Sequence, residues 1–199
     1  MLPVAQGERR ATGVHGSLQA HIRWPAETTG ALVLPNDFSW LHAGALLTAT
    51  LMAGAMQRVL DATLAYANYR AQFGKSIGKF QAVQQQLSVM AEQVFAARMA
   101  AEIGCVTEGT TPHPLRAALA KARASEAAEK VVAIAHAVHG AIGVTAEYDL
   151  HLHTRRLQEW RADFGSQAYW HAQLGAALLA APQPSTLQFL LAELLPRAA

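Results

Sequence analysis

The stretch YRAQFGKSIGKFQAVQQQL, residues 69–87, places three cations and two glycines inside a sequence otherwise rich in alanine and leucine. Its cations are Arg70, Lys75 and Lys79. A helix is expected to begin at Lys79 or at Phe80. The first turn of a helix carries unpaired backbone N–H groups, and an arginine can donate two parallel hydrogen bonds to an anion. The stretch therefore suits a phosphate or a pyrophosphate. Taken alone, it is also compatible with a solvated turn between two helices, and it is neither a Walker loop nor a dinucleotide fingerprint.

Histidines are the other residues with possible chemistry, and the chain has nine of them. His136 and His139 could share one helix face, but no Cys, Asp or Glu accompanies them at ligand spacing. His151 and His153 are two residues apart and would point in different directions on a helix. A di-iron bundle needs two Glu-x-x-His motifs, and the sequence contains none. The sequence therefore predicts no metal site.

The composition is typical of packed helices. Hydrophobic residues make up 52% of the 199 residues and charged residues only 15%, which excludes a disordered chain. The formal net charge is +2 and no dense Lys/Arg stripe occurs, so we expect no nucleic acid partner. A single cysteine, Cys105, excludes an internal disulfide framework. No apolar signal core and no membrane span are expected, which makes the cytoplasm the expected location.

Apolar residues recur at helical spacing through most of the chain, and glycines or prolines separate the runs. The clearest run is Phe80, Val83, Leu87, Met90 and Val94, at steps of three and four residues. These patterns predict an all-α fold, an antiparallel up-down bundle of four to five helices joined by short loops. The expected helices span residues 37–70, 80–104, 114–138, 147–161 and 166–179, and a short leucine-rich tail follows.

The N-terminal part of the chain differs from the rest. In SLQAHIRW, residues 17–24, apolar and polar side chains alternate, as in a half-buried strand. GALVLP, residues 30–35, is a second strand-like stretch. Two strands do not form a stable sheet alone, so they must pack on the helices, pair with another chain, or be the remnant of a larger sheet. The sequence thus predicts an N-terminal arm (1–36), which could be the remnant of a β-domain, then a helical bundle (37–181) and a helical tail (182–199).

Two long segments, residues 60–102 and 120–165, together resemble the C-terminal helical domain of acyl-CoA dehydrogenases. That domain carries the signature Tyr–Ala–x–x–Arg–x–Gln–Phe–Gly–Lys–x–Ile–x–x–Phe–Gln. The later segment is similar to the family's helix that ends in Gln–x–x–Gly–Gly–x–Gly, followed by a Thr–x–Glu segment and a paired-arginine helix. The resemblance covers roughly residues 37–180. The signature is matched at Tyr66, Ala67, Arg70, Gln72, Phe73, Gly74, Lys75, Ile77, Phe80 and Gln81.

The resemblance implies a site for FAD that is shared across a subunit interface. In this family the Arg–x–Gln–Phe turn of one subunit reaches the FAD held mainly by a neighbour, so Arg70 would contact the pyrophosphate. Gln72 and Phe73 would lie along the adenosine side. The other implied cofactor-binding positions are Ile77, Phe80 and Gln81, the backbone of Gly140 and Ala141, and the hydroxyl of Ser166.

Three departures from the family pattern argue against independent catalysis. A complete member also has an N-terminal helical domain and a central β-domain, for which only the stretches before Asn36 could remain. The glutamate that is the usual catalytic base is replaced by Phe164, and a phenyl ring cannot accept the α-proton of an acyl thioester. The alternative glutamate position, near Gly44 on the first long helix, holds no acid. Ala137 and Ala141 replace the glutamine and the second glycine of the glycine-rich element.

Two residues near the missing base keep two interpretations each. Asp163 is a weak candidate for a substitute base, and it could equally be a surface acid that caps the following helix. Ser166, which matches the family's threonine, could donate its hydroxyl to the flavin or simply start the next helix.

Two hypotheses for function follow. In the first, the chain is an acyl-CoA dehydrogenase-like flavoprotein subunit of lipid metabolism that contributes an FAD-contacting corner to a homo- or hetero-oligomer. This oligomer, which could include a full-length acyl-CoA dehydrogenase, would oxidise the α,β-bond of an acyl-CoA substrate, and the chain alone would not be catalytically complete. In the second, it is a non-catalytic helical assembly or scaffold protein derived from the same fold.

Overall fold

The structure is a computed structural model that describes residues 2–13, 19–30, 38–107 and 111–195. Its contacts divide the chain into two compact units, residues 1–39 and 40–199, and each is described by itself.

The N-terminal unit contains a two-stranded antiparallel hairpin. A short 3₁₀ turn (Val4–Gln6) precedes β1 (Glu8–Ala11), which pairs with β2 (Ala20–Arg23). The strand expected within residues 17–24 is thus confirmed as β2. β1 was not predicted, because its four side chains are all exposed and do not alternate. Residues 31–35, most of the second strand-like stretch, lie outside the described residues.

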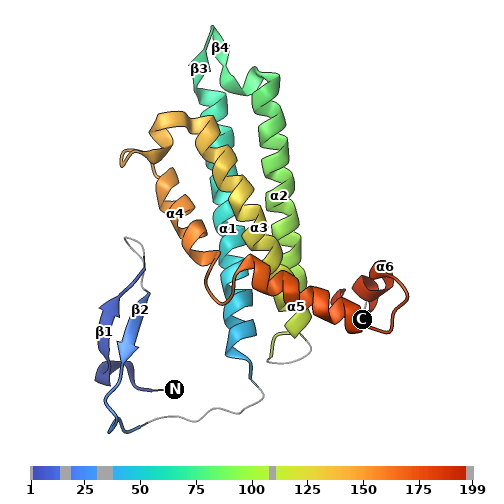
Figure 1. Ribbon diagram of the computed structural model, residues 1–199. Coiled ribbons are helices and arrows are strands. Elements are labelled where there is room, and N and C mark those ends of the chain that lie inside the picture. The colour runs from blue at the N-terminus through green and yellow to red at the C-terminus, as the bar shows by residue number, and fades with distance from the viewer. Residues whose placement is uncertain (1, 14–18, 31–37, 108–110, 196–199) are drawn as a thin grey trace. The chain divides into compact units, whose positions relative to one another are not determined.

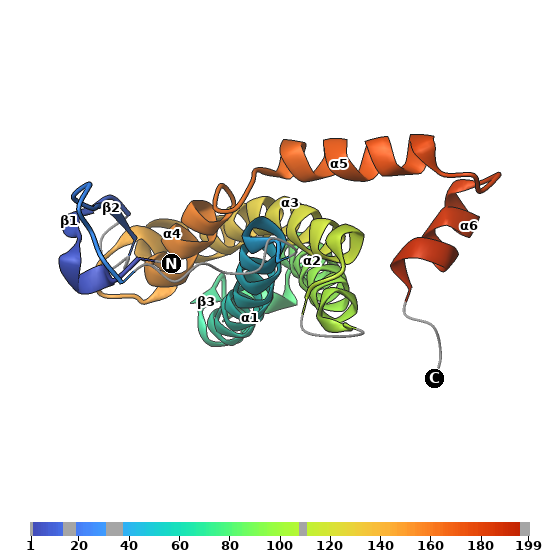
Figure 2. The same cartoon turned by 90° about the horizontal axis from the view of Figure 1, so that it is seen from below.

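Three long helices form the body of the second unit. α1 (Trp40–Tyr69), α2 (Gln81–Cys105) and α3 (Pro114–His139) run antiparallel in succession and pack side by side (Figure 1). The shorter α4 (Leu150–Trp160) packs against α1 and α3, and α5 (Gln167–Ala180) lies across the α3 side of the bundle (Figure 2). This arrangement confirms the predicted antiparallel helical bundle.

Short elements connect and extend the helices. A short hairpin and a 3₁₀ turn link α1 to α2. The hairpin has two residues in each strand, β3 (Ala71–Gln72) and β4 (Lys75–Ser76), and the turn spans Ile77–Lys79. After α5, the chain forms α6 (Thr186–Phe189) and a π-helical turn (Leu190–Leu194).

Two neighbouring residues, His113 and Pro114, determine where α3 begins. Pro114 is the first residue of α3, where the missing N–H costs no hydrogen bond, and the His113 imidazole accepts from the N–H of Arg116 at 3.4 Å. The helix expected from residue 37 is described from Trp40 onward as α1, and residue 37 itself lies outside the described residues.

The core is built largely from small side chains on α3. Ala117, Ala120, Ala124 and Ala127 are fully buried and belong to the main hydrophobic cluster with residues of α1 and α2. Because the distance between packed helices depends on the side chains between them, such alanines let the neighbouring helices approach closely. α3 is therefore the central helix, and it contacts α1, α2, α4 and α5.

By length and composition alone, two helical segments could cross a membrane, which the sequence prediction did not anticipate. They are α1 and residues 114–144, which comprise α3 and the turn after it. In each, 44% of the most apolar window is buried inside the bundle. Since α1 and α3 supply most of the main hydrophobic cluster, a core role accounts for their apolar character.

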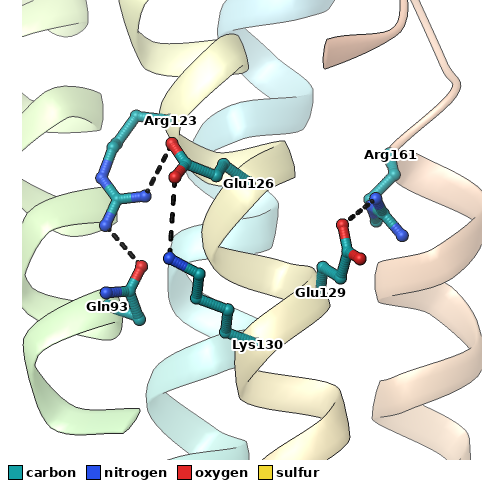
Figure 3. A network of polar contacts seen from close by, with 6 residues as sticks. All are labelled: Gln93, Arg123, Glu126, Glu129, Lys130 and Arg161. Atoms are coloured by element: carbon teal, nitrogen blue, oxygen red, sulfur yellow. Dashed lines mark hydrogen bonds and ion pairs between the residues drawn. The ribbon is translucent and has the colours of Figure 1, made fainter. Parts of the chain in front are cut away.

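Polar contacts on the surface of α3 join it to α2 and to the end of α4 (Figure 3). The Arg123 guanidinium donates to Gln93 Oε1 at 2.6 Å and lies 3.2 Å from the Glu126 carboxylate. Farther along α3, Glu129 accepts from Arg161 Nη2 at 2.8 Å. Arg161 follows the last residue of α4, so this ion pair holds the start of the α4–α5 turn against α3.

Arg116 is a buried guanidinium that anchors the C-terminal segment. Arg116 is 5% exposed, and the three nitrogens of its guanidinium donate to three backbone carbonyls. Nε bonds to Leu194 at 3.1 Å, Nη2 to Leu195 at 3.2 Å, and Nη1 to Val106 at 3.0 Å. One side chain at the start of α3 thus holds the end of α2 and the end of the tail.

The variant Arg116→Met is expected to lower the free energy of unfolding by about 3 kcal/mol, because three carbonyls lose a charged donor. Urea denaturation measures this, and faster chymotryptic cleavage after Phe189 would report release of the tail. Arg98→Met is the matched control, since Arg98 pairs with Glu102 on the exposed surface and should contribute less than about 1 kcal/mol. Equal stability of the two variants would show that the Arg116 contacts do not hold the tail.

Candidate functional site

The cationic stretch of the sequence folds into a hairpin that projects from one end of the bundle (Figure 1). In this hairpin, Ala71 pairs with Ser76 and Gln72 with Lys75. The N–H of Ile77 donates to the Arg70 carbonyl at 2.8 Å and closes the hairpin at its base. The predicted interruption between two helices is therefore an ordered structure with its own hydrogen bonds, and not an irregular loop.

The tip of the hairpin exposes an aromatic side chain on a strained backbone. Phe73 has φ = 50°, in the left-handed region that residues with a Cβ seldom occupy, and it is 93% exposed. Its ring lies edge-on to that of Phe80, with the centroids 6.3 Å apart. Tyr69, at the base, is 88% exposed. Phe73 and Gly74 both have positive φ and form the two-residue turn of the hairpin, and this turn leaves the Phe73 ring in water.

Two polar side chains of the hairpin are paired. With the Gln72 amide turned so that its oxygen faces Arg70, this oxygen accepts from Arg70 Nη2 at 2.7 Å and from Nε at 3.3 Å. Two of the guanidinium's five N–H donors are used in this way, and the side chain as a whole is exposed. Lys75 Nζ lies 4.3 Å from the centroid of the Phe80 ring, in a cation–π contact.

The remaining predicted residues of this stretch have different surroundings. Ile77 is partly buried and packs against the main hydrophobic cluster, so its side chain supports the hairpin from below. Gln81 is the first residue of α2, and Phe80 before it offers no side-chain cap. Gln81 is exposed and lines a shallow depression of about 690 Å³ together with Gln84, Gln85, Ser88 and Val89.

The glycine-rich turn after α3 lies at the same end of the bundle as the hairpin (Figure 1). Residues Gly140–Val144 form a 3₁₀ turn, and both Gly140 and Ala141 are exposed. Gly140 has φ = 63° and ψ = −144°, a conformation essentially restricted to glycine. The Tyr66 hydroxyl, one turn before Arg70 on α1, donates to the His139 carbonyl at 3.4 Å. The structure thus brings the glycine-rich turn close to the base of the hairpin.

The predicted residues Asp163, Phe164 and Ser166 lie at the opposite end of the bundle, in the turn between α4 and α5. This turn is close to Gly44, near the start of α1, whereas Arg70 directly follows the end of α1. At 1.5 Å per residue, the two positions are about 40 Å apart, farther than an extended dinucleotide reaches. Ser166 and Arg70 of one chain therefore cannot contact the same cofactor molecule.

A buried lysine organises the α4–α5 turn. Lys121 of α3 is 0% exposed, and its Nζ donates to Ser125 Oγ at 3.1 Å. It also donates to the carbonyls of Trp160 at 2.9 Å, Arg161 at 3.0 Å and Gly165 at 3.2 Å. Burial lowers the pKa of Lys121 from 10.5 to about 8, although the nearby Asp163 carboxylate raises it. The carbonyls at both ends of the turn thus converge on one ammonium group.

Phe164 occupies the turn in a left-handed conformation. Its φ is 52°, its carbonyl accepts from the Trp170 indole N–H at 3.0 Å, and its side chain is half-exposed. The ring covers Gly44 of α1, where an added Cβ would overlap it. Phe164, at the usual base position of the resemblance, is therefore in contact with Gly44, near which the resemblance places the alternative glutamate, and neither residue is an acid.

Asp163 and Ser166 flank Phe164 and Gly165 in the turn. Ser166 Oγ accepts from the Tyr169 N–H at 3.2 Å and caps α5, in agreement with its interpretation as a helix-start serine. The serine is exposed and lines a depression of about 480 Å³ with Arg161, Gln167, His171 and neighbouring residues. Asp163 is half-buried, and its charge acts on Lys121.

The contact between Gly44 and Phe164 can be tested by whether the substitution Gly44→Ala stabilises or destabilises the protein. In the wild-type background, Gly44→Ala should destabilise by about 1–2 kcal/mol, because displacing the ring costs more than the gain in helix propensity. In a Phe164→Ala background the same substitution should stabilise by about 1 kcal/mol, since the overlap is gone. Thermal or urea unfolding of the four proteins measures the cycle. The same sign in both backgrounds would mean that the ring does not rest on Gly44.

His136 and His139, the pair that could share one helix face, have protein partners. Among the residues that the structure describes, no three His, Cys, Asp or Glu side chains lie together as a metal site would need. His136 Nε2 lies 3.0 Å from Thr154 Oγ1, and His139 Nδ1 lies 2.8 Å from the Ala135 carbonyl. The expected lack of a metal ion remains a prediction.

Sequence reasoning missed Lys121 and a stack of aromatic rings around His139. Lys121 lies in an alanine-rich helical run, where a lysine is normally exposed, and its acceptors are distant backbone carbonyls that leave no sequence signal. Tyr66 was noted as part of the signature, but its contact with His139 depends on the packing of α1 on α3.

The comparisons with known proteins agree with this fold. Residues 38–179 match the family described as "Acyl-CoA dehydrogenase, C-terminal domain". The antiparallel helices, the hairpin and the glycine-rich turn thus define a C-terminal helical domain of the acyl-CoA dehydrogenase type. The chain belongs to the acyl-CoA dehydrogenase family, whose members are FAD-dependent oxidoreductases.

Among its relatives are two proteins called acyl-CoA dehydrogenase IpdE2. The one from Mycolicibacterium smegmatis is 37% identical over 132 residues, which cover 66% of this chain and 40% of the relative. The one from Mycobacterium tuberculosis is 38% identical over 112 residues, which cover 56% of this chain and 34% of the relative. The chain therefore spans well under half the length of these relatives.

Solved structures show the same arrangement. Butyryl-CoA dehydrogenase from Megasphaera elsdenii superimposes with a TM-score of 0.65 at 30% identity, over 70% of this chain and 37% of that one. The ChsE4–ChsE5 complex from Mycobacterium tuberculosis gives a TM-score of 0.67 at 26% identity, over 72% of this chain and 39% of that one.

Proposed function

We propose that this chain contributes one part of an FAD site to an oligomer that oxidises the α,β-bond of an acyl-CoA. The observation that carries the proposal is the hairpin, where Phe73 is held almost fully exposed on a strained backbone beside the paired Arg70 and Gln72. An exposed aromatic face suits the adenine ring, and a guanidinium suits a diphosphate. Both groups face outward, as a cofactor held by another chain would require.

The residues at this end fit a dinucleotide in two further respects. α2 begins at Gln81 without a side-chain cap, so the N–H groups of Gln81 and Ala82 are suited to an anion, whereas that of Val83 donates to the Phe80 carbonyl at 3.0 Å. The exposed Gly140 has no heavy atom of the protein within 4 Å of where a Cβ would lie, which leaves its backbone accessible to a ligand. When bound, FAD supplies the acceptor for the hydride. The chain's own residues bind and orient it.

The chain alone is not expected to complete the reaction. Removal of the α-proton needs a base, and Phe164 at the usual position cannot accept a proton. Ser166 already caps α5 through its Oγ, and Asp163 interacts with the Lys121 charge. The proposal therefore assigns the base to a partner chain.

A second copy of this chain or a longer acyl-CoA dehydrogenase could be the partner. The similar ChsE4–ChsE5 structure is a complex of two different proteins, and another similar structure is described as the Tcur3481–Tcur3483 steroid ACAD. Because this chain lacks a base, we favour a full-length acyl-CoA dehydrogenase as the partner and acyl-CoA as the substrate.

A second candidate function, a non-catalytic assembly protein, is supported by the apolar surface of the last helices. Leu179, Leu187 and Leu191 are 88%, 64% and 54% exposed. The sequence from Gln167 to Ala192 contains no Asp, Glu, Lys or Arg. Exposed apolar surface of this kind is typical of protein–protein contacts, and such contacts need no cofactor.

The visible absorption spectrum distinguishes the two functions. The protein is purified alone and together with acyl-CoA dehydrogenases encoded beside its gene, and flavin absorbance is recorded for each sample. Flavin that appears only in the complex with this chain supports the proposed function. A stable assembly without flavin in every mixture supports the scaffold.

A further inference from the structure

Three aromatic rings, from α1, α3 and the segment just before α4, pack together near the glycine-rich turn. Tyr66 of α1 stacks on His139, the last residue of α3, with centroids 4.4 Å apart and an interplanar angle of 23°. Tyr148, just before α4, lies with its centroid 5.0 Å from His139 and edge-on to Tyr66 at 6.0 Å. We call Tyr66, His139 and Tyr148 the His139 cluster.

The hydrogen bonds of His139 fix its tautomer. Nδ1 is 2.8 Å from the Ala135 carbonyl, which can only accept, so Nδ1 carries the proton. Nε2 then accepts from the Tyr148 hydroxyl at 3.3 Å. The residue is 4% exposed, and burial lowers the pKa of His139, which favours this neutral form. Both ring nitrogens are thus used in holding the cluster together.

The cluster restrains both ends of the glycine-rich turn. At its start, the Tyr66 hydroxyl donates to the carbonyl of His139, which directly precedes Gly140. Beyond its end, Tyr148 is held by His139 and by His151, whose Nδ1 donates to the Tyr148 carbonyl at 2.9 Å. Gly140 itself adopts a conformation that costs free energy in most sequences and persists only where the surroundings impose it.

We propose that Tyr66, His139 and Tyr148 are positioning residues that hold residues 140–144 in the conformation that approaches the cofactor. This inference rests on the proposed function, because it assumes that the turn faces FAD in the assembled oligomer. The three residues do not touch the cofactor themselves. They act through the backbone of Gly140 and Ala141.

The test combines two readouts on the flavin-loaded complex and on the free chain. Tyr148→Phe keeps the ring and removes the hydroxyl that bonds to His139, and His139→Ala removes the centre of the cluster. For Tyr148→Phe, amide hydrogen exchange at residues 140–145 of the free chain should rise about 3- to 10-fold, and the FAD dissociation constant of the complex by a similar factor. His139→Ala should raise both the exchange rate and the FAD dissociation constant by more than Tyr148→Phe does. Tyr169→Phe, at the other end of the bundle, is the control and should change neither.

Each outcome decides the inference. Faster exchange together with weaker FAD binding supports it. Unchanged exchange, or faster exchange with unchanged FAD binding, overturns it while the proposed function stands. A wild-type complex that holds no flavin overturns the proposed function, and the inference fails with it. His139→Ala could disrupt folding, but Tyr148→Phe retains all three rings and decides the question in that case.

Discussion

Replacing Lys121 by methionine should lower the free energy of unfolding by about 3 kcal/mol, an effect as large as that expected for Arg116→Met. Methionine fills a similar volume but donates no hydrogen bond, so the carbonyls of Trp160, Arg161 and Gly165 lose their shared donor. The α4–α5 turn should then lose its fixed conformation. As a result, the Phe164 ring should no longer be held against Gly44. Urea denaturation gives the free energy, and hydrogen exchange at residues 161–166 reports the turn.

Because of Lys121, the free energy of unfolding should change with pH in the alkaline range. Burial lowers its pKa in the folded protein to about 8, below the value of 10.5 that it has when exposed. Between these two values the unfolded chain binds one proton more than the folded chain, so the free energy of unfolding should rise with pH from about 8 to about 10.5. Below pH 8 both states are protonated and Lys121 adds no slope. Lys121→Met should remove the rise.

Lys130→Met is the matched control for both measurements. Lys130 lies on the same helix, its side chain is 51% exposed, and it is 3.8 Å from Glu126. It should contribute less than about 1 kcal/mol and leave the pH dependence unchanged. A Lys121→Met protein as stable as this control, with the wild-type pH profile, would contradict the role assigned to the buried ammonium.

The variant Arg70→Ala should weaken FAD binding in the assembled complex by about 10- to 100-fold, since a charged bidentate donor to the diphosphate is lost. The helices should be unaffected, because the Arg70 side chain is exposed and lies beyond the end of α1. Quenching of flavin fluorescence on titration measures the dissociation constant, and circular dichroism checks helical content.

Two further variants sharpen the Arg70 experiment. Arg70→Lys keeps the charge but cannot donate two parallel hydrogen bonds, so its affinity should lie between those of the wild type and Arg70→Ala. Arg98→Ala removes an exposed arginine from α2, far from the hairpin along that helix, and should have no effect on FAD binding. Unchanged affinity in Arg70→Ala would remove Arg70 from the site.

Much of the bundle could be predicted because its helices are long and periodic. The run from Phe80 to Val94 and the proline at the start of α3 are local signals, and the structure follows both. The hairpin was anticipated as a break between helices and as a cofactor corner by resemblance. Its exposed Phe73 and the pairing of Arg70 with Gln72 needed the structure.

The parts that could not be predicted depend on contacts between distant segments. Lys121 looks like a surface residue of α3, and only the fold brings the α4–α5 turn over it. Ile77 was assigned to the cofactor by resemblance, which stays a prediction, and only the structure shows that its partly buried side chain packs against the core. The signature alone also could not show that Ser166 and Arg70 lie at opposite ends of the bundle, because that separation follows from the direction and length of α1.

The proposed function depends on the hairpin of this chain binding the diphosphate of an FAD carried by another chain. A crystal or electron cryomicroscopy structure of the flavin-loaded complex would show this contact. We expect the Arg70 guanidinium within hydrogen-bonding distance of the diphosphate of a cofactor seated in the partner subunit. An Arg70 side chain turned into solvent, or a hairpin far from every bound flavin, would contradict it.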